Sequence, residues 1–158
     1  MTDVPTGLKD ERGSDVLSEA VCYRLLEEAA GGVGHLGLFV EGHIAVLPLN
    51  YRCFEGDIVV RLGPGSTLEA VITSPEVGFE VDHIDSNETW APAAWSVLVH
   101  GSAGIVRDPL ELGEASALGL TPMVGDAGQI YVRIRIEAIS GRSFTVAPLA
   151  RGGLAQPG

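Results

Sequence analysis

The chain has 158 residues, of which 46% are hydrophobic, and carries a formal net charge of −11 from 21 acidic and 10 basic residues. This length predicts one domain with a substantial core, while the negative charge argues against a nucleic-acid surface, which would have to form against the field of the whole protein. No apolar run approaches the roughly 20 residues of a membrane helix, and the polar residues 1–15 lack the apolar core of a signal peptide, so we expect a soluble, cytoplasmic protein with no membrane partner.

The first predicted element is a helix that begins after Ser18, its N-cap. The helix is followed by GVGHLG at residues 32–37, which matches the glycine pattern G-x-G-x-x-G of dinucleotide-binding folds. That pattern requires a strand before the glycines and a helix after them. Here a helix enters and residues 34–51 predict a β-hairpin, so we interpret Gly31 and Gly32 as the end of the helix rather than as a nucleotide site.

The remaining elements alternate strand patterns with turn residues. The hairpin turns at Glu41–Gly42, and Gly101 and Gly104 mark bends or bulges in a long strand, as in small barrels. The strand at 76–85 is expected to bury one face through Val77, Phe79, Val81 and Ile84. Further strands are predicted at residues 57–62, 93–108 and 129–144, and short helices at 66–72, capped by Ser66 or a neighbour, and at 109–118, opened by Asp108–Pro109.

Six or so antiparallel strands with three peripheral helices, and without regular βαβ alternation, predict a mainly β fold that closes as a barrel. We place this domain at residues 16–146. Residues 1–15 are expected to form a flexible N-terminal tail, and residues 147–158 a C-terminal tail.

Cysteine, lysine and histidine usage limits the possible chemistry. Cys22 and Cys53 lack C-x-x-C spacing, which favours free reduced thiols. The only lysine, Lys9, lies in the predicted tail, so no Schiff base with pyridoxal phosphate is expected and an anionic ligand must be held by arginine, hydroxyl and backbone N–H groups. Four histidines on separate predicted strands have no metal-ligand spacing, and we predict no metal site: His35, His43, His83 and His100.

The segment RLGPGSTLEA, residues 61–70, has the features of a phosphate site. Arg61 ends a predicted strand, two glycines allow the backbone to approach a ligand, and Ser66 and Thr67 place hydroxyl groups at a helix N-terminus. The G-K-[ST] sequence of a P-loop is absent. An ordinary strand-to-helix turn with a serine cap remains the alternative interpretation.

The segment LPLNY, residues 47–51, is the second candidate. Pro48 lacks an N–H group and interrupts a strand ladder, which leaves nearby backbone available to a partner. Asn50 offers a donor and an acceptor to the edge of a heterocycle, and Tyr51 can stack or donate. The alternative is a strand end with surface polar residues, and for Trp95 the alternative is packing in the core or in a dimer.

Five segments in this order carry a family resemblance: VGHLGLFVEGHIAVLPLNY, DIVVRLGPGSTLEA, VGFEVDHID, WSVLVHGSAGIVRD and IYVRIRIEAISGR. The chain resembles actinobacterial members of the pyridoxamine 5′-phosphate oxidase-like family, the FMN-binding split barrels, over about residues 18–144. The resemblance implies a six-stranded antiparallel barrel that forms a homodimer, with FMN bound in grooves at the subunit interface.

The resemblance also implies roles for individual residues. Arg61, Ser66 and Thr67 would contact the FMN phosphate, in the same segment as Leu62 and Gly63. The residues beside the isoalloxazine ring would be Pro48, Leu49, Asn50 and Tyr51. Trp95 and Ser96 would approach the site or the dimer seam, and Arg142 would come from the partner chain.

One position departs from the family pattern. Many relatives have G-S-K-L where this chain has GSTL, so Thr67 replaces a phosphate-binding lysine. The loss of one charge-assisted contact costs roughly 1.5 to 3 kcal/mol, or about a tenfold to hundredfold loss in affinity. The sequence therefore predicts weaker phosphate binding than in lysine-containing relatives.

By resemblance, the expected function is that of an FMN-dependent oxidoreductase, in which the flavin carries the chemistry and a small-molecule substrate or electron donor is the partner. Catalytic residues are not assigned. Oxidation of pyridoxamine phosphate itself is not expected, because the short chain lacks the basic residues that a second phosphorylated ligand would need. A reductase that uses the deazaflavin F420, and a module that binds flavin or haem without turnover, remain alternatives.

Overall fold

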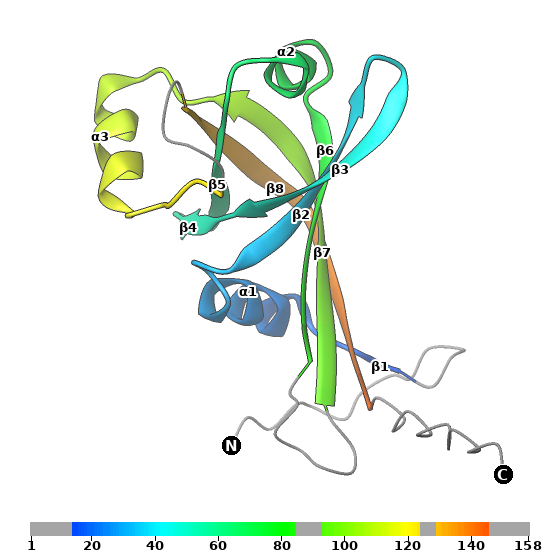
Figure 1. Ribbon diagram of the computed structural model, residues 1–158. Helices are drawn as coiled ribbons and strands as arrows, with labels where there is room; N and C mark the ends of the chain where they lie inside the picture. Colours follow the sequence, from blue (N-terminus) through cyan, green and yellow to red (C-terminus); the bar gives the residue numbers. More distant parts are fainter. Residues whose placement is uncertain (1–13, 85–92, 124–128, 146–158) are drawn as a thin grey trace, which may run out of the picture.

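The computed structural model describes residues 14–84, 93–123 and 129–145 (Figure 1). One antiparallel sheet in the order β3-β2-β6-β7-β8-β5-β4 forms the fold, and β1 pairs with β8 off this path. The strands are β1 (Asp15–Val16), β2 (Val33–Val40), β3 (His43–Asn50), β4 (Arg52–Phe54), β5 (Asp57–Leu62), β6 (Glu76–Ile84), β7 (Ala93–Ile105) and β8 (Ile130–Thr145). The helices are α1 (Glu19–Glu28), α2 (Ser66–Thr73) and α3 (Pro109–Ala117).

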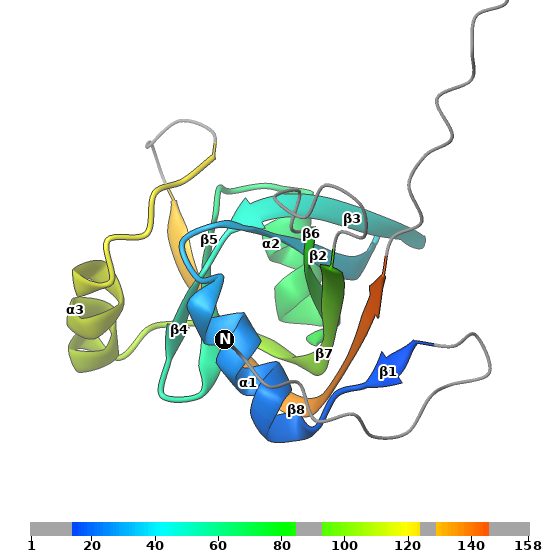
Figure 2. The same ribbon diagram turned by 90° about the horizontal axis from the view of Figure 1, so that it is seen from below.

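The sheet curls into a barrel whose ends are covered by helices. Viewed from below, the strands surround a central core, with α1 at the near end, α2 at the far end and α3 outside the ring (Figure 2). Side chains of α1 and α2 join the main core cluster, whereas α3 packs on a second cluster with Val59. The predicted mainly β barrel is therefore confirmed, with six long strands and the short β1 and β4 added to it.

Most predicted helix and turn signals are confirmed. Ser18 accepts a hydrogen bond from the Val21 N–H group and caps α1, and Gly31, at φ 96°, follows the end of this helix. Asp108 caps α3 by accepting from the first N–H groups of that helix. For α2, where the sequence predicts the cap at Ser66 or a neighbour, the N-cap is the neighbouring Gly65, and Ser66 is the first helical residue.

On β6, alternate residues face the core as expected from Val77 to Val81. Val77, Phe79 and Val81 are buried, but Ile84 is 58% exposed, so its predicted place on the same face is wrong. The physical reason is parity, since residues three apart in a strand point to opposite faces. Ile84 lies on the outer face with Glu80 and Asp82.

The pairing of the two longest strands, β7 and β8, is interrupted by a bulge at Gly101, one of the predicted bulge sites. His100 pairs with Ala138 and Gly101 pairs with Ile136, so Glu137 is an extra residue on β8. A Cβ atom at Gly101 would overlap the carbonyl oxygen of Arg135, which explains the glycine. The extra residue reverses the inward face of β8 from even positions such as Ile134 to odd positions such as Ile139.

Tyr51 marks the point where the barrel closes. The chain passes through this residue from β3, one edge of the sheet, directly into β4, the opposite edge. Its side chain is fully buried, its ring packs edge-on against Phe79 with centroids 5.3 Å apart, and its hydroxyl donates to the Leu26 carbonyl at 2.7 Å. This bond satisfies a carbonyl in the last turn of α1, where helices leave such groups without partners. Tyr51 thus links α1 to both edges of the sheet.

The chain ends and the two cysteines complete the description of the fold. Residues 1–13 and 146–158 lie outside the described residues, so the proposed tails stay predictions, although Asp15 itself pairs with Ser143 on β8. Cys22 and Cys53 are free, as expected. Burial, with a contribution from Glu27, raises the pKa of the Cys53 thiol to about 11. In the part of the chain that the structure describes, the helices are too short or too polar to span a bilayer.

Replacing Tyr51 with Phe should lower the free energy of unfolding by about 1–3 kcal/mol, because the Leu26 carbonyl would stay buried with only the long contact from the Cys53 thiol, at 3.8 Å, as its side-chain donor. Urea unfolding measures this loss. Tyr23→Phe is the matched control, since Tyr23 lies on α1 and is 37% exposed. Equal midpoints for the two variants would contradict the structural role of the Tyr51 hydroxyl.

The Cys53 thiol should react with thiol reagents at pH 8 about a hundredfold more slowly than an ordinary cysteine, because a pKa of about 11 leaves little thiolate. The rate should recover in denaturant. Since the pKa in the folded state lies above the ordinary value of 9.0, stability should also fall as the pH rises from 9 toward 11. The Cys22→Ser variant leaves Cys53 as its one cysteine. Fast labelling of this folded variant at pH 8 would refute the predicted slow reaction of the Cys53 thiol.

Candidate functional site

The loop between β5 and α2 presents a helix N-terminus without a side-chain cap. Gly65 has φ 142°, a conformation that L side chains rarely adopt, and it makes no side-chain hydrogen bond to the helix. Ser66 is exposed and Thr67 is half-buried at the first positions of α2. The helix start therefore offers backbone N–H groups and two hydroxyl groups, which together suit an anion such as a phosphate.

Arg61 supplies the positive charge next to this loop. Its Nη1 atom donates to the Leu120 carbonyl at 3.3 Å, and its guanidinium carbon lies 5.2 Å from the centroid of the Tyr131 ring. Stacking and hydrogen bonding both restrict the guanidinium, so less entropy is lost when it binds an anion. The predicted phosphate segment is thus supported by a positively charged group that is already ordered.

Asn50 lies at the end of β3, and the segment after α3 connects it to Arg61. Its Nδ2 atom donates to the Thr121 carbonyl at 2.9 Å, while the preceding residue, Leu120, accepts from Arg61. β3 also lies against β5, although the two strands are far apart in the order of the sheet. The structure therefore brings Asn50 and Arg61, from two separate sequence motifs, to the same seam of the barrel.

The structure places the other residues of these two motifs in different environments. Pro48 is exposed and pairs in register with His35, and Leu49 is half-buried against the core. Tyr51 and Leu62 are buried in the core, so they have almost no side-chain surface for a ligand. The roles of these residues beside a flavin ring stay predictions, and Tyr51 would fulfil its role through its backbone.

Gln129 is a residue of this region that the sequence analysis missed. Its Nε2 atom lies 3.4 Å from the position that a Cβ atom at Gly63 would take. The following residue, Ile130, pairs with Leu62 in the sheet. Only the strand register shows this proximity, because Gly63 and Gln129 are 66 positions apart in the sequence. An amide donor therefore lies beside the loop that leads to Ser66 and Thr67.

The remaining candidates lie at the other end of β7 and β8. Ser96 pairs with Arg142, and the Trp95 ring lies 6.0 Å from that of His83. Arg61 pairs with Tyr131 on β8, and Arg142 lies roughly 36 Å further along this strand at about 3.3 Å per residue. Figure 1 shows these ends of β7 and β8 away from α2. Within one chain, Trp95, Ser96 and Arg142 do not join the site at Arg61.

The described side chains that titrate abnormally belong mainly to the core. Burial raises the pKa of Tyr51 and of both thiols, which disfavours a thiolate nucleophile. Burial and the neighbouring Asp82 also raise the pKa of Glu80, although its hydrogen bond to His35 opposes this shift. Among the described residues, no three His, Cys, Asp or Glu side chains group as metal ligands.

Comparison with solved structures finds similar folds in bacterial proteins. A Corynebacterium glutamicum protein described as a candidate pyridoxamine 5′-phosphate oxidase is 26% identical, with 89% of this chain and 99% of that chain covered and a TM-score of 0.70. A FAD-binding protein from Mycobacterium smegmatis is 29% identical over 82% of this chain and 98% of its own, with a TM-score of 0.64. A FAD-binding protein from Mesorhizobium loti is 26% identical over 83% and 98%, with a TM-score of 0.67.

Comparison with curated proteins finds no match. The family model described as pyridoxamine 5′-phosphate oxidase matches residues 18–143, which include β2 to β7 and nearly all of β8. The matched residues include the end of β3 with Asn50, the end of β5 with Arg61, and the loop before α2. The curled antiparallel sheet has the architecture expected from the sequence. The chain therefore belongs to the pyridoxamine 5′-phosphate oxidase-like family of split barrels.

Proposed function

We propose that this protein binds FMN at the barrel seam and acts as a flavin-dependent oxidoreductase on a small-molecule substrate or electron donor. The observation that carries the proposal is the group of hydrogen-bond donors between β5 and α2 that could bind a phosphate. Arg61 is ordered by Leu120 and Tyr131, and the N-terminus of α2 has no side-chain cap. Two relatives with 26–29% identity are FAD-binding proteins, which favours a flavin as the ligand.

The chemical types of these donors, a guanidinium and two hydroxyl groups, suit a flavin phosphate. Arg61, Ser66 and Thr67 would hold the phosphate, while Asn50, whose Nδ2 atom is held by Thr121, keeps its amide oxygen as an acceptor for a ring N–H group. The backbone of Pro48 and Leu49 would line the ring. A bound flavin supplies hydride or electron transfer, and the protein supplies position and charge. FMN is favoured over the more anionic F420 because of the net charge of −11.

We further propose that the protein acts as a homodimer through the outer face of the sheet. Large apolar side chains are exposed on this face: Phe39, Ile44, Val46, Ile84, Leu98 and Phe144. Phe39 and Ile44 are direct cross-strand partners, and even positions of β6 and β7, and of β8 beyond its bulge, continue the same face. Such a surface is typical of an interaction site. A second chain would also bring Trp95, Ser96 and Arg142 toward the flavin, which one chain cannot do.

The flavin site is tested by titration of the purified protein with FMN and with riboflavin, which lacks the phosphate. Wild-type protein should bind FMN with saturation at low micromolar concentration. Arg61→Gln should weaken FMN binding by about tenfold to hundredfold through loss of a charge-assisted contact, with little effect on riboflavin. Arg135→Gln is the matched control, since Arg135 is exposed on β8. Flavin fluorescence quenching measures both affinities.

Thr67→Lys restores the charge of the family pattern and should strengthen FMN binding. Parallel titrations with FAD, F420 and haem compare the other cofactors. A protein that ignores FMN but binds F420 or haem tightly would replace the proposed cofactor. FMN that binds but is not reduced by any electron donor would favour a binding module over an oxidoreductase.

The dimer is tested with Ile44→Glu, which places a charge on the centre of the exposed face, where Ile44 is 72% exposed. Sedimentation should give twice the 16.5 kDa chain mass for the wild type and the chain mass for the variant. Ile72→Glu is the control, because Ile72 is 58% exposed on α2, outside the sheet. A monomeric wild type at micromolar concentration would contradict the composite site.

A further inference from the structure

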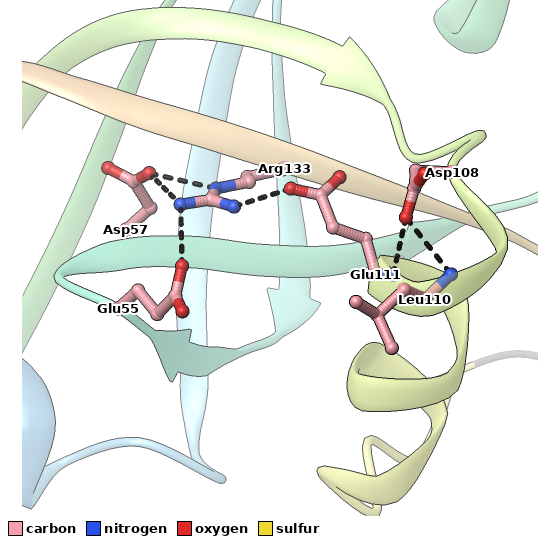
Figure 3. Close-up of polar contacts among 6 residues, drawn as sticks. All are labelled: Glu55, Asp57, Asp108, Leu110, Glu111 and Arg133. Atoms are coloured by element: carbon pink, nitrogen blue, oxygen red, sulfur yellow. Dashed lines mark hydrogen bonds and ion pairs between the residues drawn. The ribbon is translucent and has the colours of Figure 1, made fainter.

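Arg133 forms the centre of a charged cluster on the outside of the barrel. Its Nε and Nη2 atoms both donate to Asp57 Oδ2 at 2.8 Å, and its Nη1 atom donates to Glu111 Oε1 at 2.8 Å (Figure 3). The side chain is only 16% exposed, and its guanidinium carbon also lies 5.2 Å from the Phe54 ring centroid. Glu55 is more distant, at 3.7 Å, and is largely exposed.

This cluster joins three elements. Arg133 lies on β8, Asp57 begins β5, and Glu111 lies in the first turn of α3. Asp57 Oδ1 also accepts from the Ile136 N–H group, so the carboxylate is fixed against β8 from two sides. The bond to Glu111 is therefore a connection from a rigid sheet to a helix that lies outside the barrel (Figure 2).

The chain that leaves α3 leads directly to the candidate site. Leu120 is buried against Val59 and Tyr131, in the cluster that also holds Ala115 of α3. The Leu120 carbonyl binds Arg61, and the next carbonyl, that of Thr121, binds Asn50. A shift of α3 would therefore move two acceptors that hold two proposed flavin ligands.

We propose that Arg133 and Glu111 are positioning residues for the flavin site, because together they hold α3 so that Leu120 and Thr121 fix Arg61 and Asn50. The inference rests on the proposed flavin function for its effect on affinity, but its structural part, the order of the Arg61 and Asn50 side chains, does not. The Val59 cluster supplies the nonpolar contacts, which have little directionality. The bond between Arg133 and Glu111 supplies direction, because the N–H groups of a guanidinium point in fixed directions and Arg133 is itself held by Asp57.

The test compares Glu111→Gln with Glu114→Gln, which makes the same change on the same helix at an exposed position. The first readout is the ¹⁵N heteronuclear NOE of the Arg61 Nε–H group without flavin, assigned by its loss in Arg61→Gln. The Arg61 side chain should be ordered in the wild type and in Glu114→Gln, and mobile in Glu111→Gln. This readout does not require a bound flavin.

The second readout is FMN affinity in a mutant cycle. Glu111→Gln should weaken FMN binding by about threefold to tenfold, and it should have no further effect in a background that carries both Arg61→Gln and Asn50→Ala, because the change acts through these two side chains. A merely structural loss would persist in that background. If Glu111→Gln does not fold, Glu111→Asp, which keeps the charge but shortens the side chain, takes its place.

An Arg61 side chain that stays equally ordered in Glu111→Gln would overturn the proposal. An affinity loss that persists without both Arg61 and Asn50 would overturn it as well. A wild-type protein that binds no flavin, but in which Glu111→Gln still loosens Arg61, would refute the proposed function and support the positioning role. The two proposals can therefore fail separately.

Discussion

Closure of the sheet at Tyr51 is the constraint on which the rest of this structure depends. The two edges of the sheet are consecutive in the chain, so one residue must turn the backbone from β3 into β4 and remain inside the barrel. A buried tyrosine meets both needs, because its ring fills the core beside Phe79 and its hydroxyl satisfies the Leu26 carbonyl. Its neighbour Asn50 is thereby held at the seam.

β8 provides the framework that this closure completes. It pairs with β1, β7 and β5, and the bulge opposite Gly101 reverses its inward face partway along its length. One part of β8 holds Arg61 through Tyr131 and binds Asp57 through Arg133. Another part carries Arg142 beside Ser96. A single long strand thus contributes to both regions that a composite flavin site would need, at opposite ends of the barrel.

Arg61 and Arg133 have different roles in this acidic chain. Arg133 is neutralised by Asp57 and Glu111 and serves the fold, while Arg61 donates to the Leu120 carbonyl and stacks on the Tyr131 ring. With threonine at position 67, the positive charge identified at the loop before α2 is that of Arg61. The orientation of Arg61 therefore controls the affinity that we propose.

The sequence by itself determined the six long strands, most helix caps and the turns, because these depend on local periodicity and backbone conformation. It also indicated Arg61, Ser66 and Thr67 as one segment. The tertiary structure alone decided the burial of Tyr51, the outward turn of Ile84, the extra residue Glu137 and the approach of Gln129 to Gly63. It also separated Arg142 from Arg61. The physical reason is that register, closure and contacts between distant residues arise from packing of the whole chain, which a local pattern does not encode.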